Sequence, residues 1–155
     1  MRVRVIAVGT RMPVWVKSAC EDYLRRLAPL NVSLQQVEAG IRGRGAGTAR
    51  AVAAEGERLL AAVRAAEHVV ALDERGKELS TRELSSWLNA RLQEGEDLAF
   101  MIGGADGLAP AVLGRANFKW SLSRLTLPHA LVRVLLTEQL YRAHSILMNH
   151  PYHRD

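Results

Sequence analysis

Five short segments, most of them apolar throughout, alternate along the chain with stretches in which apolar residues recur at helical spacing. Uninterrupted apolar runs of this length are typical of strands that are buried on both faces. The alternation predicts an α/β fold, a mostly parallel sheet flanked by helices. We expect the strands at Val3–Val8, Val32–Val37, His68–Leu72, Leu98–Ile102 and Trp120–Leu122.

Proline and capping residues indicate where the helices between these strands begin. A proline opens three of them, because its missing N–H is not needed in the first turn. These prolines are Pro13, Pro110 and Pro128. Ser80 and Glu83 form a capping box, and Thr48 is a candidate N-cap. The helical stretches are expected to run to about Leu27, Val63, Leu92, Leu113 and Leu147.

One stretch of the chain, residues 39–47, is rich in glycine and carries Arg42 and Arg44. Regular structure is not expected there, because glycine loses more backbone entropy on ordering than any other residue. No linker composition or internal repeat interrupts the rest of the sequence. Residues 1–155 are therefore expected to form one domain, as is usual at roughly 100–150 residues.

The charge is basic and comes mainly from arginine. Lysine and arginine number 21 against 16 acidic residues, and only three of the basic residues are lysines. The planar guanidinium suits phosphates and base edges, so an RNA or DNA partner is one interpretation. A solvated arginine-rich surface explains the charge equally well. With 48% hydrophobic residues, the composition excludes a disordered tail, a collagen-like chain and a disulfide-stapled miniprotein.

Compartment and metal content follow from what the sequence contains. A single cysteine, Cys20, allows no internal disulfide, and no apolar run is long enough to span a membrane. We therefore expect a cytoplasmic protein without a membrane partner. His150 and His153 lack a cysteine or carboxylate at ligand spacing, so no metal site is expected.

Ligands of parallel α/β sheets bind beyond the carboxyl ends of the strands. Here one strand is followed by Gly103-Gly104-Ala105-Asp106-Gly107, where the absence of Cβ atoms lets a ligand approach the backbone. The spacing matches neither a dinucleotide fingerprint nor a phosphate loop. Bare backbone with nearby leucines suits a neutral adenine and ribose. An ordinary turn, and an ordinary half-buried strand after it, are the alternative interpretations.

The last helix and the tail after it are also unusual. The helix is apolar around most of its circumference, a pattern typical of burial against a partner subunit. The tail, residues 149–155, combines aromatic, imidazole and guanidinium groups, the combination by which proteins hold unpaired bases. A disordered terminus is the alternative interpretation of the tail.

Several stretches together carry a family resemblance. They are VIAVGTRMPVWV near the start, IGGADGL, WSLSRLTLPHALVRVLLTEQLYRA and NHPYHR. Over its whole length the chain resembles the ribosomal large-subunit pseudouridine N3-methyltransferase family, which belongs to the SPOUT class. The last two motifs are highly specific for that family.

The resemblance implies a SPOUT-type fold with a C-terminal trefoil knot, which general rules would not predict because true knots are very rare. It also implies a homodimer. The expected enzyme is an rRNA (pseudouridine-N3-)-methyltransferase with S-adenosyl-L-methionine as cofactor. Its expected substrate is N3 of a pseudouridine in a hairpin loop of large-subunit (23S) ribosomal RNA, in the assembled ribosome.

The resemblance places the cofactor against three loops of the knot. On this chain they supply nine candidate cofactor-binding residues: Leu72, Gly103, Gly104, Leu122, Ser123, Arg124, Leu125, Thr126 and Leu127. Relatives often show Gly-Gly-Pro-Glu-Gly where this chain has Gly-Gly-Ala-Asp-Gly, so the acid and the final glycine are kept. Arg124 stands where relatives vary, and would add a phosphate contact if it faces RNA.

Methylation of N3 requires either a base that removes its proton or cations that stabilise the anion. The candidate catalytic residues are His129, Arg133, Tyr152, His153 and Arg154. We expect Tyr152 and Arg154 to hold the base and its phosphate, and His129 or His153 to handle or orient the proton. A packing role at the start of the last helix is the alternative for His129. A terminal tail can also complete the site of the other subunit.

Three other functions remain open at this point. A non-catalytic RNA-binding module would use Arg42, Arg44 and the tail, and would have no reason to bind S-adenosylmethionine. A SPOUT enzyme with another target, such as transfer RNA, is compatible with the N-terminal half, although the tail motif argues against it. A small-molecule α/β enzyme has no evident use for the basic charge and the aromatic tail.

Overall fold

Five parallel strands form the sheet, in the order β2-β1-β4-β3-β5. This computed structural model describes residues 1–43 and 47–154. The strands are β1 (Val3–Val8), β2 (Val32–Val37), β3 (His68–Glu78), β4 (Leu98–Ile102) and β5 (Phe118–Ser121). The expected α/β class with a mostly parallel sheet is thereby confirmed, and each strand lies within a few residues of its predicted place.

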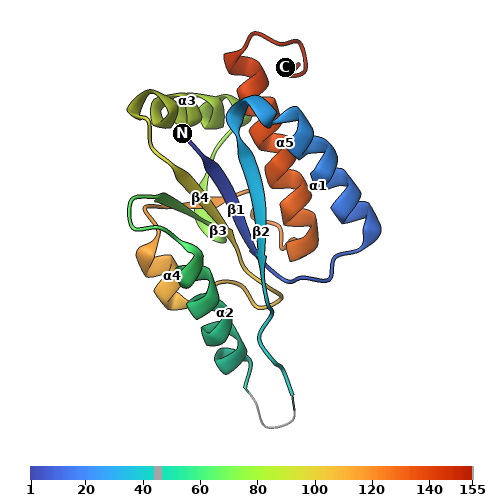
Figure 1. Ribbon diagram of the computed structural model, residues 1–155, viewed down its shortest axis with the longest axis vertical. Helices are drawn as coiled ribbons and strands as arrows, with labels where there is room; N and C mark the ends of the chain where they lie inside the picture. Colours follow the sequence, from blue (N-terminus) through green and yellow to red (C-terminus); the bar gives the residue numbers. More distant parts are fainter. Residues whose placement is uncertain (44–46, 155) are drawn as a thin grey trace.

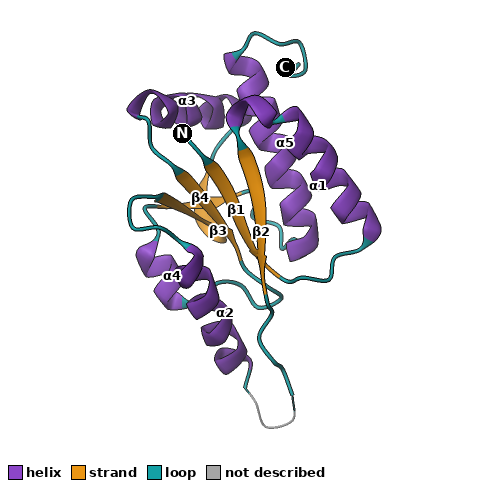
Figure 2. Cartoon of the chain, in the orientation of Figure 1, coloured by secondary structure: helices purple, strands orange, loops and turns teal. Residues whose placement is uncertain are grey.

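Helices cover both faces of this sheet (Figures 1 and 2). They are α1 (Val14–Arg26), α2 (Thr48–Ala62), α3 (Thr81–Glu94), α4 (Pro110–Arg115) and α5 (His129–Leu147), with a 3₁₀ turn at Ala28–Leu30. Helices α1, α3 and α5 pack on one face and α2 and α4 on the other. None of the helices in the described ranges is long and apolar enough to cross a membrane. The threading of the chain into a knot stays a prediction.

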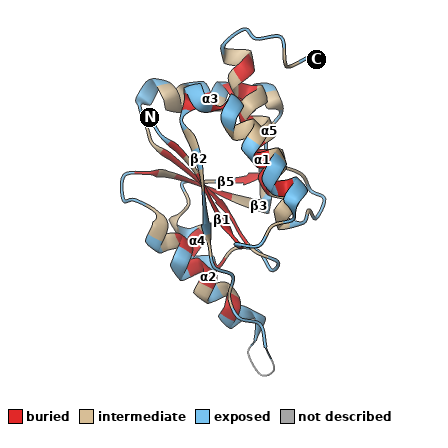
Figure 3. Cartoon of the chain, turned by 45° about the vertical axis from the view of Figure 1, so that its right-hand side comes forward, coloured by how far each residue is buried: buried red, intermediate tan, exposed pale blue. Residues whose placement is uncertain are grey.

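The core consists of two apolar layers, one on each side of the sheet. Val5 and Ala7 of β1 point into the layer under α1, α3 and α5, while Ile6 and Val8 point into the layer under α2 and α4. Successive side chains of a strand point to opposite faces, so a strand between two helical layers must be apolar at every position. Figure 3 shows the buried residues concentrated on the strands and on the inner faces of the helices.

One prediction about helix capping differs from the structure. Thr48 is the first residue of α2, and Gly47 takes the N-cap position without a side-chain hydrogen bond. The capping box of Ser80 and Glu83 is confirmed. Among the residues of the glycine-rich loop, 39–43 adopt no regular structure, while Arg44 lies outside the described residues.

Strand β3 is longer than predicted, because it resumes after an irregularity. Leu72 and Lys77 both pair with Trp120 of β5, so residues 73–76 bulge out of the ladder. Gly76 permits this close return: a Cβ there would lie 2.7 Å from the Lys119 carbonyl carbon. Periodicity ends at the first break in the apolar run, so it could not detect the second half of the strand.

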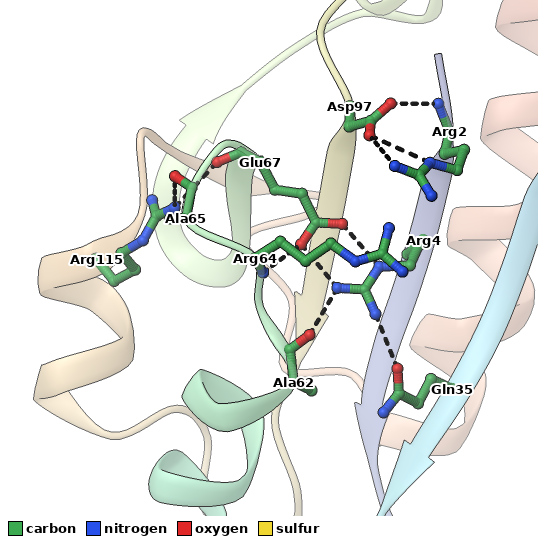
Figure 4. Close-up of polar contacts among 9 residues, drawn as sticks. All are labelled: Arg2, Arg4, Gln35, Ala62, Arg64, Ala65, Glu67, Asp97 and Arg115. Carbon is green, nitrogen blue, oxygen red and sulfur yellow. Dashed lines mark hydrogen bonds and ion pairs between the residues drawn. The ribbon is translucent and has the colours of Figure 1, made fainter.

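A buried ion pair between Arg4 and Glu67 stabilises the end of the sheet at which the strands begin (Figure 4). The Glu67 carboxylate accepts hydrogen bonds from Arg4 Nε and Nη2, both at 2.7 Å, and from the Arg64 backbone N–H. Arg4 also donates to Gln35 Oε1 and to the Ala62 carbonyl. Burial is the largest single effect and opposes the ionisation of Glu67, but the hydrogen bonds and charges of Arg4 and Arg64 together outweigh it, and the pKa of Glu67 is lowered.

Glu67→Gln is expected to lower the free energy of unfolding by about 3 kcal/mol, because it leaves Arg4 without its buried counter-charge. The matched control is Asp97→Asn, which breaks the Arg2–Asp97 pair at the same end of the sheet, where the Arg2 side chain is 56% exposed. That control should lose about 1 kcal/mol or less. Urea unfolding measures both values, and equal losses would contradict the prediction.

Candidate active site

A cavity of about 300 Å³ opens at the carboxyl ends of the strands, where ligands of parallel sheets bind. Three loops form most of its wall: the β3 bulge, the turn after β4 and the segment after β5. The lining residues from these loops are Leu72–Arg75, Ile102–Leu108, and Leu122, Ser123, Leu125, Thr126 and Leu127. His129 and Val132 of α5 close one side.

The turn after β4 exposes backbone because two glycines fold it tightly. The Gly107 N–H donates to the Gly104 carbonyl at 3.1 Å, and Gly107 has φ +81°. A Cβ on Gly103 would lie 2.6 Å from the Gly107 carbonyl carbon, which no real side chain tolerates. A Cβ on Gly104 would point at Val8 and at the Glu55 carboxylate, not into the cavity. Gly103 is therefore required by the shape of the turn, whereas a side chain at Gly104 would crowd the Val8 and Glu55 side chains.

Hydrogen bonds hold the segment after β5 in a non-repetitive shape. Ser121 Oγ donates to the Ser123 carbonyl at 2.8 Å, and Ser123 Oγ accepts from the Leu125 N–H at 3.0 Å. Thr126 Oγ1 donates to Glu74 Oε2 at 3.2 Å, which joins this segment to the β3 bulge. The small polar side chains thus fix the loop, and the leucines are available to line the cavity.

His129 begins α5 at the edge of the cavity. Its Nδ1 is buried and has no hydrogen-bond partner among the described residues. Burial, and next the charge of Arg133, lower the pKa of His129 below its ordinary 6.5. The imidazole is consequently neutral at pH 7 and can accept a proton.

Arg133, one turn further along α5, is buried rather than directed into the cavity. Its Nη2 donates to the Val8 and Gly9 carbonyls at 2.9 and 2.7 Å, and its Nη1 donates to Gln36 Oε1 at 2.7 Å. These bonds tie α5 to the carboxyl end of β1. Arg133 instead lines a second cavity of about 330 Å³, between α1 and the edge of the sheet.

The tail folds back onto the far half of α5. The Tyr152 ring stacks on Tyr141, with centroids 4.5 Å apart, and Arg142 lies 4.7 Å from its centroid. The Tyr152 hydroxyl donates to Glu138 Oε1 at 3.3 Å. Burial, together with a hydrogen bond to Tyr23, raises the pKa of Tyr152 to about 12, so the phenol stays protonated.

Comparison with known proteins identifies this arrangement. Residues 1–153 match the family model described as predicted SPOUT methyltransferase. The chain belongs to the SPOUT methyltransferase family.

Curated relatives of this SPOUT chain are similar over their full length. The chain is 48% identical to a protein of Chromohalobacter salexigens, over 99% of this chain and 100% of the relative. It is 49% identical to a protein of Thioalkalivibrio sulfidiphilus over all of both chains, and 51% identical to one of Burkholderia mallei over 99% of each. Each relative is named ribosomal RNA large subunit methyltransferase H. The chain is accordingly a methyltransferase enzyme.

Solved structures agree with the SPOUT fold. A probable methyltransferase from Bordetella pertussis superposes with a TM-score of 0.57 at 19% identity, covering 92% of this chain and 95% of that one. A probable methylase family protein from Haemophilus influenzae gives a TM-score of 0.56 at 15% identity, covering 99% and 70%. At such identities the likeness concerns the fold alone.

The structure brings together most, but not all, of the site residues predicted from the sequence. Eight of the nine cofactor candidates line the main cavity: Leu72, Gly103, Gly104, Leu122, Ser123, Leu125, Thr126 and Leu127. The catalytic candidate His129 lines it as well. Arg124 does not, because its side chain is 89% exposed and pairs with Glu78.

The remaining catalytic candidates lie away from the cavity of their own chain. Tyr152 contacts Glu138, nine residues along α5 from His129, which is about 14 Å of helix. His153 and Arg154 follow on the same tail, and the C-terminus lies at the end of the molecule opposite the carboxyl ends of β1 and β2 (Figure 1). Within one chain, tail and cavity are therefore separate.

Several lining residues were not among the candidates. Asp73, Glu74 and Arg75 line the cavity because the β3 bulge pushes them out of the ladder. Asp106 and Trp120 line it as well. The available signal was position, since all of them stand at or near the ends of predicted strands.

Proposed function

We propose that this chain methylates N3 of a pseudouridine in a hairpin loop of large-subunit (23S) ribosomal RNA, in the assembled ribosome, with S-adenosylmethionine as methyl donor. One observation carries the proposal: proteins named for methylation of large-subunit ribosomal RNA match this chain end to end at about half identity. The target atom follows from the resemblance, through the NHPYHR tail and the WSLSRLTLPHALVRV segment.

The cavity fits the proposed donor. Its volume of about 300 Å³ is at the lower end of the usual ~300–1,000 Å³ of small-molecule pockets. Leucines at 72, 122, 125 and 127 offer apolar surface for an adenine ring, and the tight turn at Gly103–Gly107 offers main-chain groups for its edge and the ribose. When bound, S-adenosylmethionine supplies an electrophilic methyl group on its sulfonium.

The chain's own part in catalysis is then positioning and proton handling. His129 stands at the cavity edge with a neutral imidazole and a buried Nδ1 that has no partner among the described residues. It accepts the proton of N3 or orients the base. Arg133 supports this role indirectly: it ties α5 to β1 and adds positive charge near His129.

The pH profile of kcat/KM tests the role of His129. Because the pKa of His129 is lowered below 6.5, the neutral form persists through neutral pH, and activity should fall only as pH drops through that lowered pKa. Asn at position 129 cannot titrate, so His129→Asn should reduce the rate by about a hundredfold and remove this acid limb. A variant that keeps the wild-type profile would contradict the assignment.

A homodimer accounts for the exposed apolar surface at the start of α1 and for the distance between the tail and the cavity. At the start of α1, Val14 and Trp15 are exposed, and they form apolar surface that a second copy can cover. In a dimer, the tail of one subunit can reach the cavity of the other, where Tyr152 and Arg154 hold the base and its phosphate. Two chains also double the net charge of +5 available for ribosomal RNA, whose phosphates dominate affinity. The ribosome places the enzyme in the cytoplasm.

Mass spectrometry of ribosomal RNA from a strain lacking this gene tests the reaction directly. The expected result is one missing methyl group on a pseudouridine of the large-subunit RNA, restored by the wild-type gene. Loss of a methyl group from transfer RNA instead would favour the other SPOUT target. An unchanged methylation pattern together with intact RNA binding would favour a non-catalytic module.

A further inference from the structure

A buried carboxylate outside the cavity wall organises the glycine-rich loop. Glu55 lies on α2, and its side chain is 2% exposed. It accepts hydrogen bonds from the Gly40 N–H at 2.8 Å and from Arg42 Nη1 and Nη2 at 2.9 and 3.4 Å. A buried carboxylate is costly unless it is paired in this way, so the Arg42 guanidinium is required by the fold around Glu55.

The same guanidinium reaches the turn after β4. Arg42 Nε donates to Asp106 Oδ2 at 2.8 Å, and Arg42 Nη1 also donates to the Gly40 carbonyl at 3.2 Å. Arg42 therefore bridges two carboxylates, one on α2 and one on the turn that lines the cavity. Lysine could not reproduce this bridge, because it offers a point charge in place of a planar fork.

Tight packing leaves these three elements little freedom. A Cβ on Gly40 would lie 2.3 Å from the Ala51 carbonyl oxygen, so the loop rests directly on α2. A Cβ on Gly56 would lie 2.6 Å from the Ala109 side chain, so α2 rests directly on the segment after the turn. A Cβ on Gly104 would lie 3.2 Å from Glu55 Oε1. The bridge thus joins parts that are in close contact at these three glycines.

The bridge is also electrostatically coupled to the cavity. The charges of Glu55 and Arg42 both act on the pKa of His129, which Glu55 raises and Arg42 lowers, after the larger effects of burial and Arg133. An isolated surface ion pair would be worth little. Here one partner is almost fully buried, and the other end is in the wall of the cavity.

We propose that Arg42 is a positioning residue for the methyl donor: by bridging Asp106 to the buried Glu55, it holds the Gly103–Gly107 turn in the shape that binds S-adenosylmethionine. Residues 39–43 of the glycine-rich loop thereby belong to the machinery of the cofactor cavity. This inference rests on the proposed use of S-adenosylmethionine.

Calorimetric titration with S-adenosylmethionine tests the bridge on the full-length chain. Arg42→Gln and Asp106→Asn should each weaken binding about tenfold, as expected for one charge-assisted hydrogen bond. The double variant should bind S-adenosylmethionine no more weakly than the single variant with the lower affinity, because both changes break the Arg42–Asp106 contact. In methylation assays the KM for S-adenosylmethionine should rise, while kcat at saturation stays within about twofold.

Arg58→Gln is the matched control. Arg58 lies on α2, as Glu55 does, and donates to the Glu38 and Ala39 carbonyls at the start of the loop. Among the described residues, none of its hydrogen bonds goes to the Gly103–Gly107 turn. It should bind S-adenosylmethionine like the wild type. Additive effects of Arg42→Gln and Asp106→Asn, wild-type affinity of Arg42→Gln, or equal weakening by Arg58→Gln would each overturn the proposal. If the wild type itself fails to bind S-adenosylmethionine, the proposed cofactor is wrong, which is a separate result.

Discussion

Gly103→Ala is expected to weaken binding of S-adenosylmethionine by about a hundredfold. The added Cβ would lie 2.6 Å from the Gly107 carbonyl carbon and 2.7 Å from its oxygen. Both atoms are backbone, so the turn itself must open, and overpacking of this kind costs ~1–3 kcal/mol. Calorimetric titration of the purified variant measures the loss, and the unfolding temperature shows whether the rest of the fold survives.

Gly114→Ala provides the control for that experiment. Gly114 lies on α4, and a Cβ there meets nothing within 4 Å in the structure. Alanine in a helix should leave cofactor binding unchanged and stabilise the protein by up to about 1 kcal/mol. If Gly103→Ala binds S-adenosylmethionine as tightly as Gly114→Ala does, the cofactor is not held by this turn.

Removal of residues 150–155 is expected to have the second large effect. Cofactor binding should change by less than about twofold, because the tail lies at the opposite end of α5 from His129 (Figure 1). Methylation of ribosomes should fall by a hundredfold or more, the approximate effect of losing groups that position the base and stabilise its charge. Loss of cofactor binding, or retained methylation, would contradict the assignment of the tail.

A mixed dimer joins these two predictions in one test. When a tail-less chain is combined with a Gly103→Ala chain, one intact cavity and one intact tail belong to different subunits. If the tail serves the partner's cavity, the mixed dimer regains activity at one site, although each variant alone is inactive. If each tail serves its own chain, the mixture stays inactive. The outcome therefore decides which subunit supplies Tyr152 and Arg154.

Local sequence signals predicted the elements of this fold well. Apolar runs marked the strands because every strand between two helical layers needs apolar side chains on both faces. Prolines and the Ser80–Glu83 box marked helix starts because those signals act through bonds within one turn. The loops after β4 and β5 could be found for the same reason, since strand ends in a parallel sheet share one edge.

Structural features that depend on residues far apart in the sequence could not be predicted in this way. The β3 bulge exists because Gly76 returns against β5, which is more than forty residues away along the chain. The pairing of Glu55 with Arg42, and the place of Glu55 beside the Gly103–Gly107 turn, follow from the packing of α2. Arg133 was one of the catalytic candidates, whereas its Nη1 and Nη2 groups donate to Gln36 and to the Val8 and Gly9 carbonyls.

The sequence by itself determined the α/β class, the places of the strands and helices, and eight of the residues that line the cavity. These depend on contacts within a few residues, or on motifs that can be compared directly. Only the tertiary structure decided that the tail packs against α5 away from the cavity, that Arg133 is buried, and that Arg42 joins Glu55 to Asp106. Each of these results depends on which surfaces meet after the chain folds, and neither periodicity nor spacing carries that information.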